Sequence, residues 1–230
     1  MILNKINFDI IKKKLRIYLF NFFFFRKFFY NYKSTKRLKI FNNLNLNKNS
    51  IFLDFGGHEG VFSYFFLDKF NCKIEIYEPS KILFEILKKK FKKFKNVSVH
   101  NLAVSNKSAS SKLYFHNKTT KENFLIFAQS SSLISVQKEN ISKNIFEKIK
   151  TINLKKILNK HKFIDVIKID IEGAEYKILD TIILNMHKIG IVYCELNGKP
   201  KNPLLENKKQ VIIKKLKKKG YWNKKFIEFS

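Results

Sequence analysis

From residue 50 onward, the sequence alternates short apolar segments with longer segments of helical length. The first five predicted elements are strand, helix, strand, helix and strand, at residues 50–55, 60–70, 72–78, 80–94 and 96–100. Strands that alternate with helices in this way are joined by right-handed crossovers, which makes the strands parallel. Helices then cover both faces of the sheet. The pattern therefore predicts an α/β fold with a mostly parallel sheet.

The alternation continues to the end of the chain. The further elements are an edge strand at 111–116, a strand at 148–153, a helix at 154–161, a central strand at 163–170, a helix at 173–189, a strand at 190–196, a helix at 206–220 and a last edge strand at 224–229. A long polar loop containing "QSSSLIS" interrupts the series, and a loop of this length in a compact domain is usually functional or disordered. The chain of 230 residues suits one domain, which we place at residues 46–230.

Residues 1–45 form a basic, Phe-rich segment that we expect to be helical. Its apolar run is interrupted by charged and polar residues well before it reaches the length of a membrane span. Two arrangements remain open. The segment packs on the domain behind it, or residues 15–30 lie in a membrane interface with their basic side chains toward anionic lipid.

The net charge of +29 comes almost entirely from lysine, because only three of the 47 basic residues are arginine. Arginine is the residue that grips phosphate in a bidentate way, so this charge is weak support for a nucleic-acid partner. One explanation of the positive charge is compositional drift toward Lys, Asn, Ile and Phe. The alternative is that the charge attracts anionic glycans, nucleic acid or lipid. The two cysteines are too few for a disulfide framework or a zinc site, which fits a reducing cytoplasm.

Three of the seven glycines, Gly56, Gly57 and Gly60, follow the first predicted strand directly. In open α/β sheets, ligands bind beyond the carboxyl ends of the strands, and a glycine loop there allows a nucleotide to come close to the backbone. Asp54 and Glu59 flank this loop, and their carboxylates would repel a pyrophosphate. An acidic loop favours a cationic ligand instead, such as the sulfonium end of S-adenosylmethionine.

Two more strand ends carry acids. Glu78 ends the second strand, 24 residues after Asp54, where a carboxylate can accept hydrogen bonds from both hydroxyls of a ribose. Asp170, Glu172 and Glu175 crowd the end of the central strand and what we predict to be the first turn of a helix. Acids there also stabilise a helix N-terminus. However, Asp170 ends a strand that faces the same crevice as Asp54, which favours a role in binding or catalysis.

Taken together, these motifs resemble the FkbM-type methyltransferases, a Rossmann-like family that depends on S-adenosylmethionine. The resemblance covers residues 50–197 and rests on five motifs in the family's order: "DFGGHEGVFS", "IYEPS", "HNLAVSNKSAS", "SSSL" and "IDVIKIDIEGAEYKIL". The family usually has Asn where His58 stands. The resemblance implies a Rossmann-like methyltransferase fold, here with the N-terminal helical extension.

The resemblance also implies S-adenosylmethionine as the cofactor and O-methylation of a hydroxyl on a sugar, glycan or similar small molecule. The implied cofactor residues are Asp54, Gly56, Gly57 and Gly60 at the methionine end, Glu78 at the ribose, and the backbone near Leu102 and Ala103 at the adenine. Asp170 and Glu172 would lie near the methyl group or the acceptor hydroxyl. The alternatives are an RNA methyltransferase and a non-catalytic binding protein that keeps the fold.

Two residues, Asp170 and His58, are candidates for the base that removes the proton of the acceptor hydroxyl. A carboxylate such as Asp170 is too weak a base to ionise an alcohol beforehand, so it takes the proton only as the methyl group is transferred. His58 is the rival, because its side chain titrates near neutral pH, although it also fills the place of the family's Asn. We expect no metal; the alternative is Mg²⁺ bound by Asp170, Glu195 and Asn197.

Overall fold

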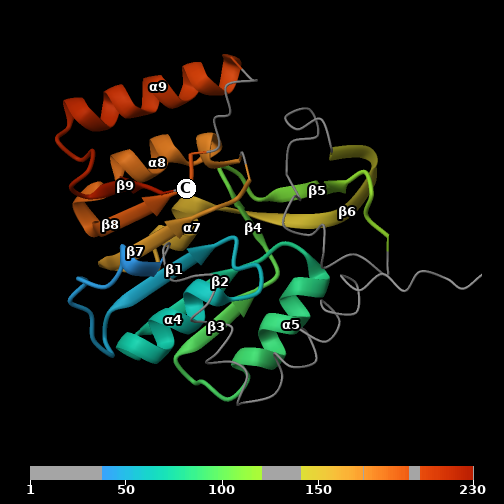
Figure 1. Ribbon diagram of the computed structural model, residues 1–230, viewed down its shortest axis with the longest axis horizontal. Coiled ribbons are helices and arrows are strands. Elements are labelled where there is room, and N and C mark those ends of the chain that lie inside the picture. The colour runs from blue at the N-terminus through green and yellow to red at the C-terminus, as the bar shows by residue number, and fades with distance from the viewer. Residues whose placement is uncertain (1–37, 121–140, 173, 197–202, 230) are drawn as a thin grey trace, which may run out of the picture.

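The computed structural model describes residues 38–120, 141–172, 174–196 and 203–229 (Figure 1). Its centre is a six-stranded sheet in which every neighbouring pair is parallel. The strands in spatial order are β3 (Val97–His100), β2 (Lys73–Tyr77), β1 (Ile51–Phe55), β7 (Ile164–Ile169), β8 (Ile189–Cys194) and β9 (Phe226–Glu228). The prediction of a parallel α/β sheet is confirmed, and β9 is the edge strand that the sequence predicted.

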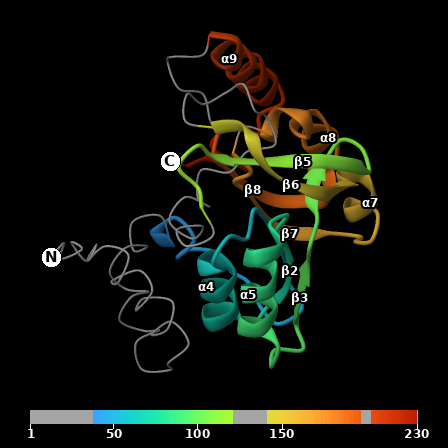
Figure 2. The ribbon, with the colours of Figure 1, turned by 90° about the vertical axis from the view of Figure 1, so that its right-hand side faces the viewer.

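Helices cover both faces of this sheet (Figures 1 and 2). On one face lie α4 (Val61–Phe70) and α5 (Lys81–Phe91), whose buried Phe66, Leu87 and Phe91 pack on β1 and β2. On the other face lie α7 (Leu154–Leu158), α8 (Leu179–Leu184) and α9 (Pro203–Lys218). Two apolar cores result, one on each side of the sheet, which is the arrangement of a Rossmann-like domain.

A second sheet, which the sequence did not separate from the first, connects β3 to α7. It contains β4 (Ala103–Ser105), β6 (Ile141–Asn153) and β5 (Ala109–His116) in that spatial order. β5 is an edge strand, as predicted, but it pairs antiparallel with β6 in this small sheet. β6 is also longer than the predicted strand at 148–153, because residues from Ile141 onward continue the pairing with β5.

The single helix predicted at 173–189 is wrong. The described residues of this segment form a 3₁₀ turn at Glu175–Lys177, then α8, then a second 3₁₀ turn at Met186–Lys188. The apolar residues of the segment are nevertheless buried at helical spacing, since Ile178, Ile182 and Met186 are all fully buried. The cause lies in composition: β-branched residues and Asn185 lower the helix propensity of the segment, so burial holds the turns in place without a continuous helix.

Part of the predicted N-terminal extension falls within the described residues. Leu38 and Phe41 are buried, and the Phe41 ring lies 4.3 Å from the ring of Tyr193 on β8 and 5.2 Å from that of Phe66 on α4. This end of the extension therefore packs on the domain. The remainder, including the membrane contact predicted at 15–30, lies outside the described residues, as do residues 129–135 of the polar loop. Among the described helices, none is both long and apolar enough to span a membrane.

Candidate functional site

The site lies at the carboxyl edge of the large sheet, around β1 and β7. These two strands are neighbours, and the chain leaves β1 toward β2 on one side and β7 toward β8 on the other. Such a reversal of strand order opens a crevice for ligands. The loop after β1 crosses to the end of β2, where the backbone N–H groups of Gly56 and Gly57 donate to the carbonyl of Tyr77 at 3.0 and 3.3 Å.

The glycines of this loop make room for the protein's own atoms. Gly56 has a φ of +82°, and a Cβ on it would lie 1.9 Å from the carbonyl oxygen of Asp170. A Cβ on Gly57 would lie 2.2 Å from Ile76 Cγ2, and one on Gly60 2.7 Å from Leu87 Cδ2. Close packing of the loop on β2, on Asp170 after β7 and on α5 thus accounts for all three glycines. Their contact with a cofactor stays a prediction.

A buried lysine lies beneath the loop. Lys168 on β7 is 2% exposed, and its Nζ donates to the carbonyl oxygen of Gly56 at 2.7 Å. The same Nζ lies 3.3 Å from Asp54 Oδ1 and 3.7 Å from Asp170 Oδ2. The other oxygen of Asp54 accepts a hydrogen bond from Ser63 Oγ on α4 at 2.7 Å. One ammonium group therefore joins β1, the glycine loop and the end of β7.

Carboxylates keep Lys168 charged. Burial alone would lower the pKa of its ammonium group, but the charges of Asp54 and Asp170 outweigh burial and raise this pKa above its ordinary value. Sequence reasoning missed this residue. The available signal was a lysine in the middle of "FIDVIKID", an otherwise apolar central strand, because a fully buried lysine nearly always has a charged partner.

Asp54 and Asp170 differ in what they present to a ligand. Asp54 is fully buried and engaged by Ser63 and Lys168, whereas the side chain of Asp170 is 20% exposed. Asp170 is also fixed by its backbone, since its N–H donates to the carbonyl of Phe55 at 3.1 Å. Asp170 is thus the better placed of the two to reach a substrate.

Glu172 does not lie in the first turn of an α-helix, as the sequence had suggested. It has a φ of +55°, and α8 begins only at Leu179. A non-glycine residue in this left-handed region is uncommon and stores backbone strain. Its predicted place beside the acceptor is not tested by this geometry. Glu175, in contrast, is fully buried and accepts a hydrogen bond from the N–H of Ile171 at 3.0 Å, so its role is structural.

Glu78, just beyond β2, is held by two backbone donors. Its Oε2 accepts from the N–H of His58 at 2.9 Å, and its Oε1 accepts from the N–H of Ser80 at 2.9 Å. His58 has a φ of +49°. Asn and His are among the residues that tolerate this conformation best, which accounts for a histidine at this position. The loop and the predicted ribose acid are thus brought together.

The predicted adenine segment is adjacent to Glu78. The backbone N–H of Glu78 donates to the carbonyl of His100 at 3.0 Å, and the side-chain amide of Asn101 donates to the carbonyl of Glu78 at 3.1 Å. Leu102 and Ala103 follow directly, with Ala103 at the start of β4. The side chain of Ala103 is buried, and contact of the backbone here with an adenine stays a prediction. Asn101 was not foreseen.

Burial changes the titration of Glu78. It raises the pKa of the carboxyl group from its ordinary value of 4.5 to about 7, although the N–H donors of Ser80 and His58 and the charge of Lys168 act in the opposite direction. Hydroxyl groups that donate to this carboxyl would favour its ionised form. A perturbed acid at a strand end is typical of a functional site.

Acids gather at this edge despite the chain's positive charge. Five of the 18 acidic residues lie at or next to the carboxyl ends of β1, β2, β7 and β8: Asp54, Glu78, Asp170, Glu172 and Glu195. These carboxylates repel a pyrophosphate and fit a cationic cofactor whose hydroxyl groups donate hydrogen bonds to them. S-adenosylmethionine has both features.

Within the described part of the chain, no three His, Cys, Asp or Glu side chains form a metal site. Asn197, one of the three ligands in the magnesium alternative, lies outside that part.

Comparison with known families gives one match. The methyltransferase FkbM domain matches residues 54–221, which includes every site residue named above. Among curated proteins, none matches the chain.

We predict that Lys168→Met lowers the free energy of unfolding by about 3–5 kcal/mol, because it leaves the buried carboxylate of Asp54 without its cation. Urea unfolding followed by circular dichroism measures this. The matched control is Lys177→Met at an exposed position, which should change the free energy by less than about 0.5 kcal/mol. Equal effects of the two substitutions would contradict the role of Lys168.

We also predict a pH dependence of stability that originates from Glu78. Because its pKa is raised in the folded state, its contribution to stability is complete below pH 4.5 and is lost as the pH rises to about 7. The loss amounts to about 3 kcal/mol. Glu78→Gln mimics the protonated acid, so its free energy of unfolding should lack this decline in urea titrations between pH 4.5 and 8. Glu85→Gln, at an exposed position, should retain it. Parallel pH profiles for the wild type and Glu78→Gln would refute the assignment.

Proposed function

Because the chain belongs to the FkbM methyltransferase family, we propose that it is an S-adenosylmethionine-dependent O-methyltransferase acting on a hydroxyl of a sugar, glycan or similar small molecule. The observation that carries the proposal is the acidic carboxyl edge of the sheet, with Glu78 and Asp170 on either side of the glycine loop. The sugar class follows from the family resemblance. A cytoplasmic location is part of the same proposal.

Cofactor binding is assigned to residues of the first two strand ends. Glu78 would accept hydrogen bonds from the ribose hydroxyls, and the backbone near Leu102 and Ala103 would border the adenine. Asp54 and the loop of Gly56, Gly57 and Gly60 would hold the methionine end. In this protein Asp54 would act through the loop, because its carboxylate is fully buried and bound to Lys168 and Ser63.

The chemistry assigned to the chain's own residues is positioning and proton removal. When bound, S-adenosylmethionine supplies a methyl group that its sulfonium activates. Transfer breaks the carbon–sulfur bond, forms a carbon–oxygen bond and releases the hydroxyl proton. Asp170 would hold that hydroxyl in line and accept its proton as the transfer proceeds. Lys168 would orient the Asp170 carboxylate, and Glu172 would lie beside the acceptor.

The first test is cofactor binding by calorimetry. We predict that the protein binds S-adenosylmethionine and not NAD, and that Glu78→Ala weakens binding at least tenfold, about 1.4 kcal/mol. Glu85→Ala, which removes an exposed carboxylate of α5, should leave the affinity unchanged. Tighter binding of NAD would refute the cofactor assignment. Absence of binding to either compound would favour a non-catalytic binding protein.

The second test concerns Asp170. We predict that Asp170→Asn lowers turnover by roughly 10²-fold, the usual size of a lost general base, while the affinity for S-adenosylmethionine stays within about twofold. Tritiated S-adenosylmethionine and a panel of hexoses, deoxyhexoses and their oligosaccharides provide the assay. Asp180→Asn is the control, since Asp180 is 65% exposed on α8.

Two outcomes would change the assignment. If Asp170→Asn abolishes cofactor binding and spares turnover at saturating cofactor, Asp170 belongs to the methionine site and His58 becomes the base. If the tritium label enters RNA in preference to every saccharide, and does so at physiological salt, the acceptor class is wrong. Weak and steeply salt-dependent RNA binding would reflect the lysine-rich surface alone.

A further inference from the structure

A concave site lies at the amino edge of the large sheet, opposite the candidate methyltransferase site. It is a cavity of about 670 Å³ at the amino ends of β1, β2 and β3, bordered among others by Ile51, Lys73 and Val97. Cavities of this size commonly bind small molecules. Because the strands are parallel, this edge is separated from the candidate methyltransferase site by the length of the strands.

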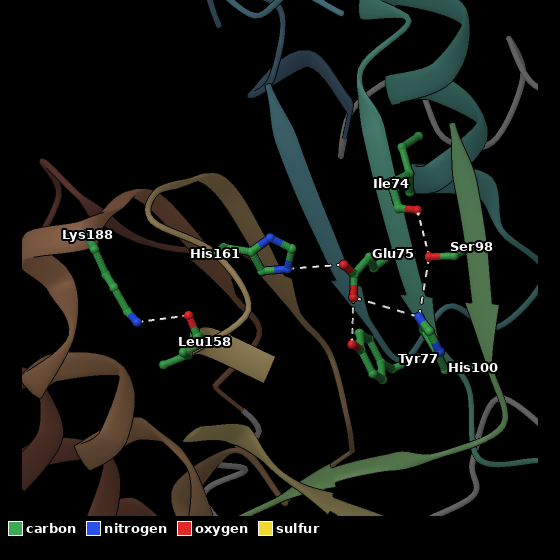
Figure 3. Close-up of polar contacts among 8 residues, drawn as sticks. All are labelled: Ile74, Glu75, Tyr77, Ser98, His100, Leu158, His161 and Lys188. Carbon is green, nitrogen blue, oxygen red and sulfur yellow. Dashed lines mark hydrogen bonds and ion pairs between the residues drawn. The ribbon is translucent and has the colours of Figure 1, made fainter. Parts of the chain in front are cut away.

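Three polar side chains border the cavity, Glu75 of β2, Ser98 of β3 and His161. Two more, Tyr77 and His100, contact Glu75 from the carboxyl ends of β2 and β3 (Figure 3). The hydroxyl of Tyr77 donates to Glu75 Oε2 at 2.7 Å, and His161 Nε2 lies 3.0 Å from Glu75 Oε1. On β3, His100 Nε2 lies 3.7 Å from Glu75 Oε2 and 3.3 Å from Ser98 Oγ. These side chains offer both donors and acceptors, because a carboxylate has about four acceptor sites and a hydroxyl both donates and accepts.

His161 is fixed in place from the other side of the cavity. It follows α7, and its backbone N–H donates to the carbonyl of Leu158 at 3.3 Å. Lys188 Nζ donates to the same carbonyl at 2.8 Å (Figure 3). The end of α7 is thus tied to the segment before β8, and the imidazole is held against Glu75. Preorganised polar groups of this kind bind a ligand with less loss of side-chain entropy.

The rim of the cavity is basic. Lys48, Lys73 and Lys95 all border it and are exposed. The carboxylate of Asp165 also lies at this edge, where it accepts a hydrogen bond from the N–H of Ile51 at 2.7 Å. Three ammonium groups around one cavity attract an anion, and lysine is a common ligand of phosphate.

We propose that this cavity binds a phosphorylated sugar, with the phosphate at the lysine rim and the sugar hydroxyls at Glu75, Ser98 and His161. A phosphorylated sugar matches both features of the cavity. Its phosphate suits the basic rim, and its hydroxyl groups suit the hydrogen-bond donors and acceptors of Glu75, Ser98 and His161. A bare phosphate would use only the first, and a neutral sugar only the second. The site is independent of the methyl transfer proposed above.

Calorimetry with glucose 6-phosphate, inorganic phosphate and glucose tests this. Glucose 6-phosphate should bind at least about tenfold more tightly than either of the others. The double substitution Lys73→Ala/Lys95→Ala should weaken its binding by about tenfold or more. The matched control Lys89→Ala/Lys93→Ala removes two exposed lysines that do not border the cavity and should leave binding within about twofold. S-adenosylmethionine affinity, measured in parallel, should be the same in all variants.

A second measurement does not depend on variants. Acetylation of the wild-type protein, followed by mass spectrometry, should show that glucose 6-phosphate protects Lys73 and Lys95 but not Lys89. Equal weakening by both double substitutions, or equal protection of all three lysines, would mean that the overall charge attracts the phosphate and would overturn the proposal. Equal affinity for phosphate and glucose 6-phosphate would overturn it as well.

Discussion

The buried ammonium group of Lys168 is the interaction on which the candidate site depends. It contacts a carboxylate on β1, a carbonyl of the glycine loop and the carboxylate that ends β7. Each partner comes from a different segment, and none of them is fully exposed to water. A charge in such a place is tolerated only when its partners satisfy it. The loop, Asp54 and Asp170 are therefore positioned by one another, before any ligand binds.

The second constraint is the way Glu78 joins the loop to the end of β2. Its two oxygens accept hydrogen bonds from the N–H groups of His58 and Ser80. Burial raises the pKa of this carboxyl group although both donors act in the opposite direction. The same carboxyl group is the one proposed to hold the ribose. A ligand that donates hydroxyl groups to it would stabilise the charged form and, through His58, the conformation of the loop. Cofactor binding and loop order would then be coupled, as in other sites where a carboxylate changes its environment on binding.

Local patterns in the sequence were sufficient for the parallel sheet and for most of the acidic strand ends. Asp54, Glu78 and Asp170 were found because each follows an apolar run, and parallel strands place such residues at one edge. Lys168 was missed because two of its partners, Asp54 and Gly56, lie on another segment, and because the chain has many other lysines. The small sheet of β4, β5 and β6 was missed for a similar reason, since its pairing partners lie 25 to 48 residues apart in the sequence and leave no local signal. The single helix predicted at 173–189 was wrong because β-branched residues and Asn185 lower the helix propensity of a segment whose apolar residues keep helical spacing.

Lys168 and Asp54 stabilise the site as one unit beneath the loop. A double-mutant cycle with Asp54→Asn, Lys168→Met and both together, measured by urea unfolding, determines how strongly the two side chains are coupled. We expect the double variant to lose less stability than the sum of the single variants, by at least about 1.5 kcal/mol. Additivity within about 0.5 kcal/mol would contradict it, because each side chain would then act without the other.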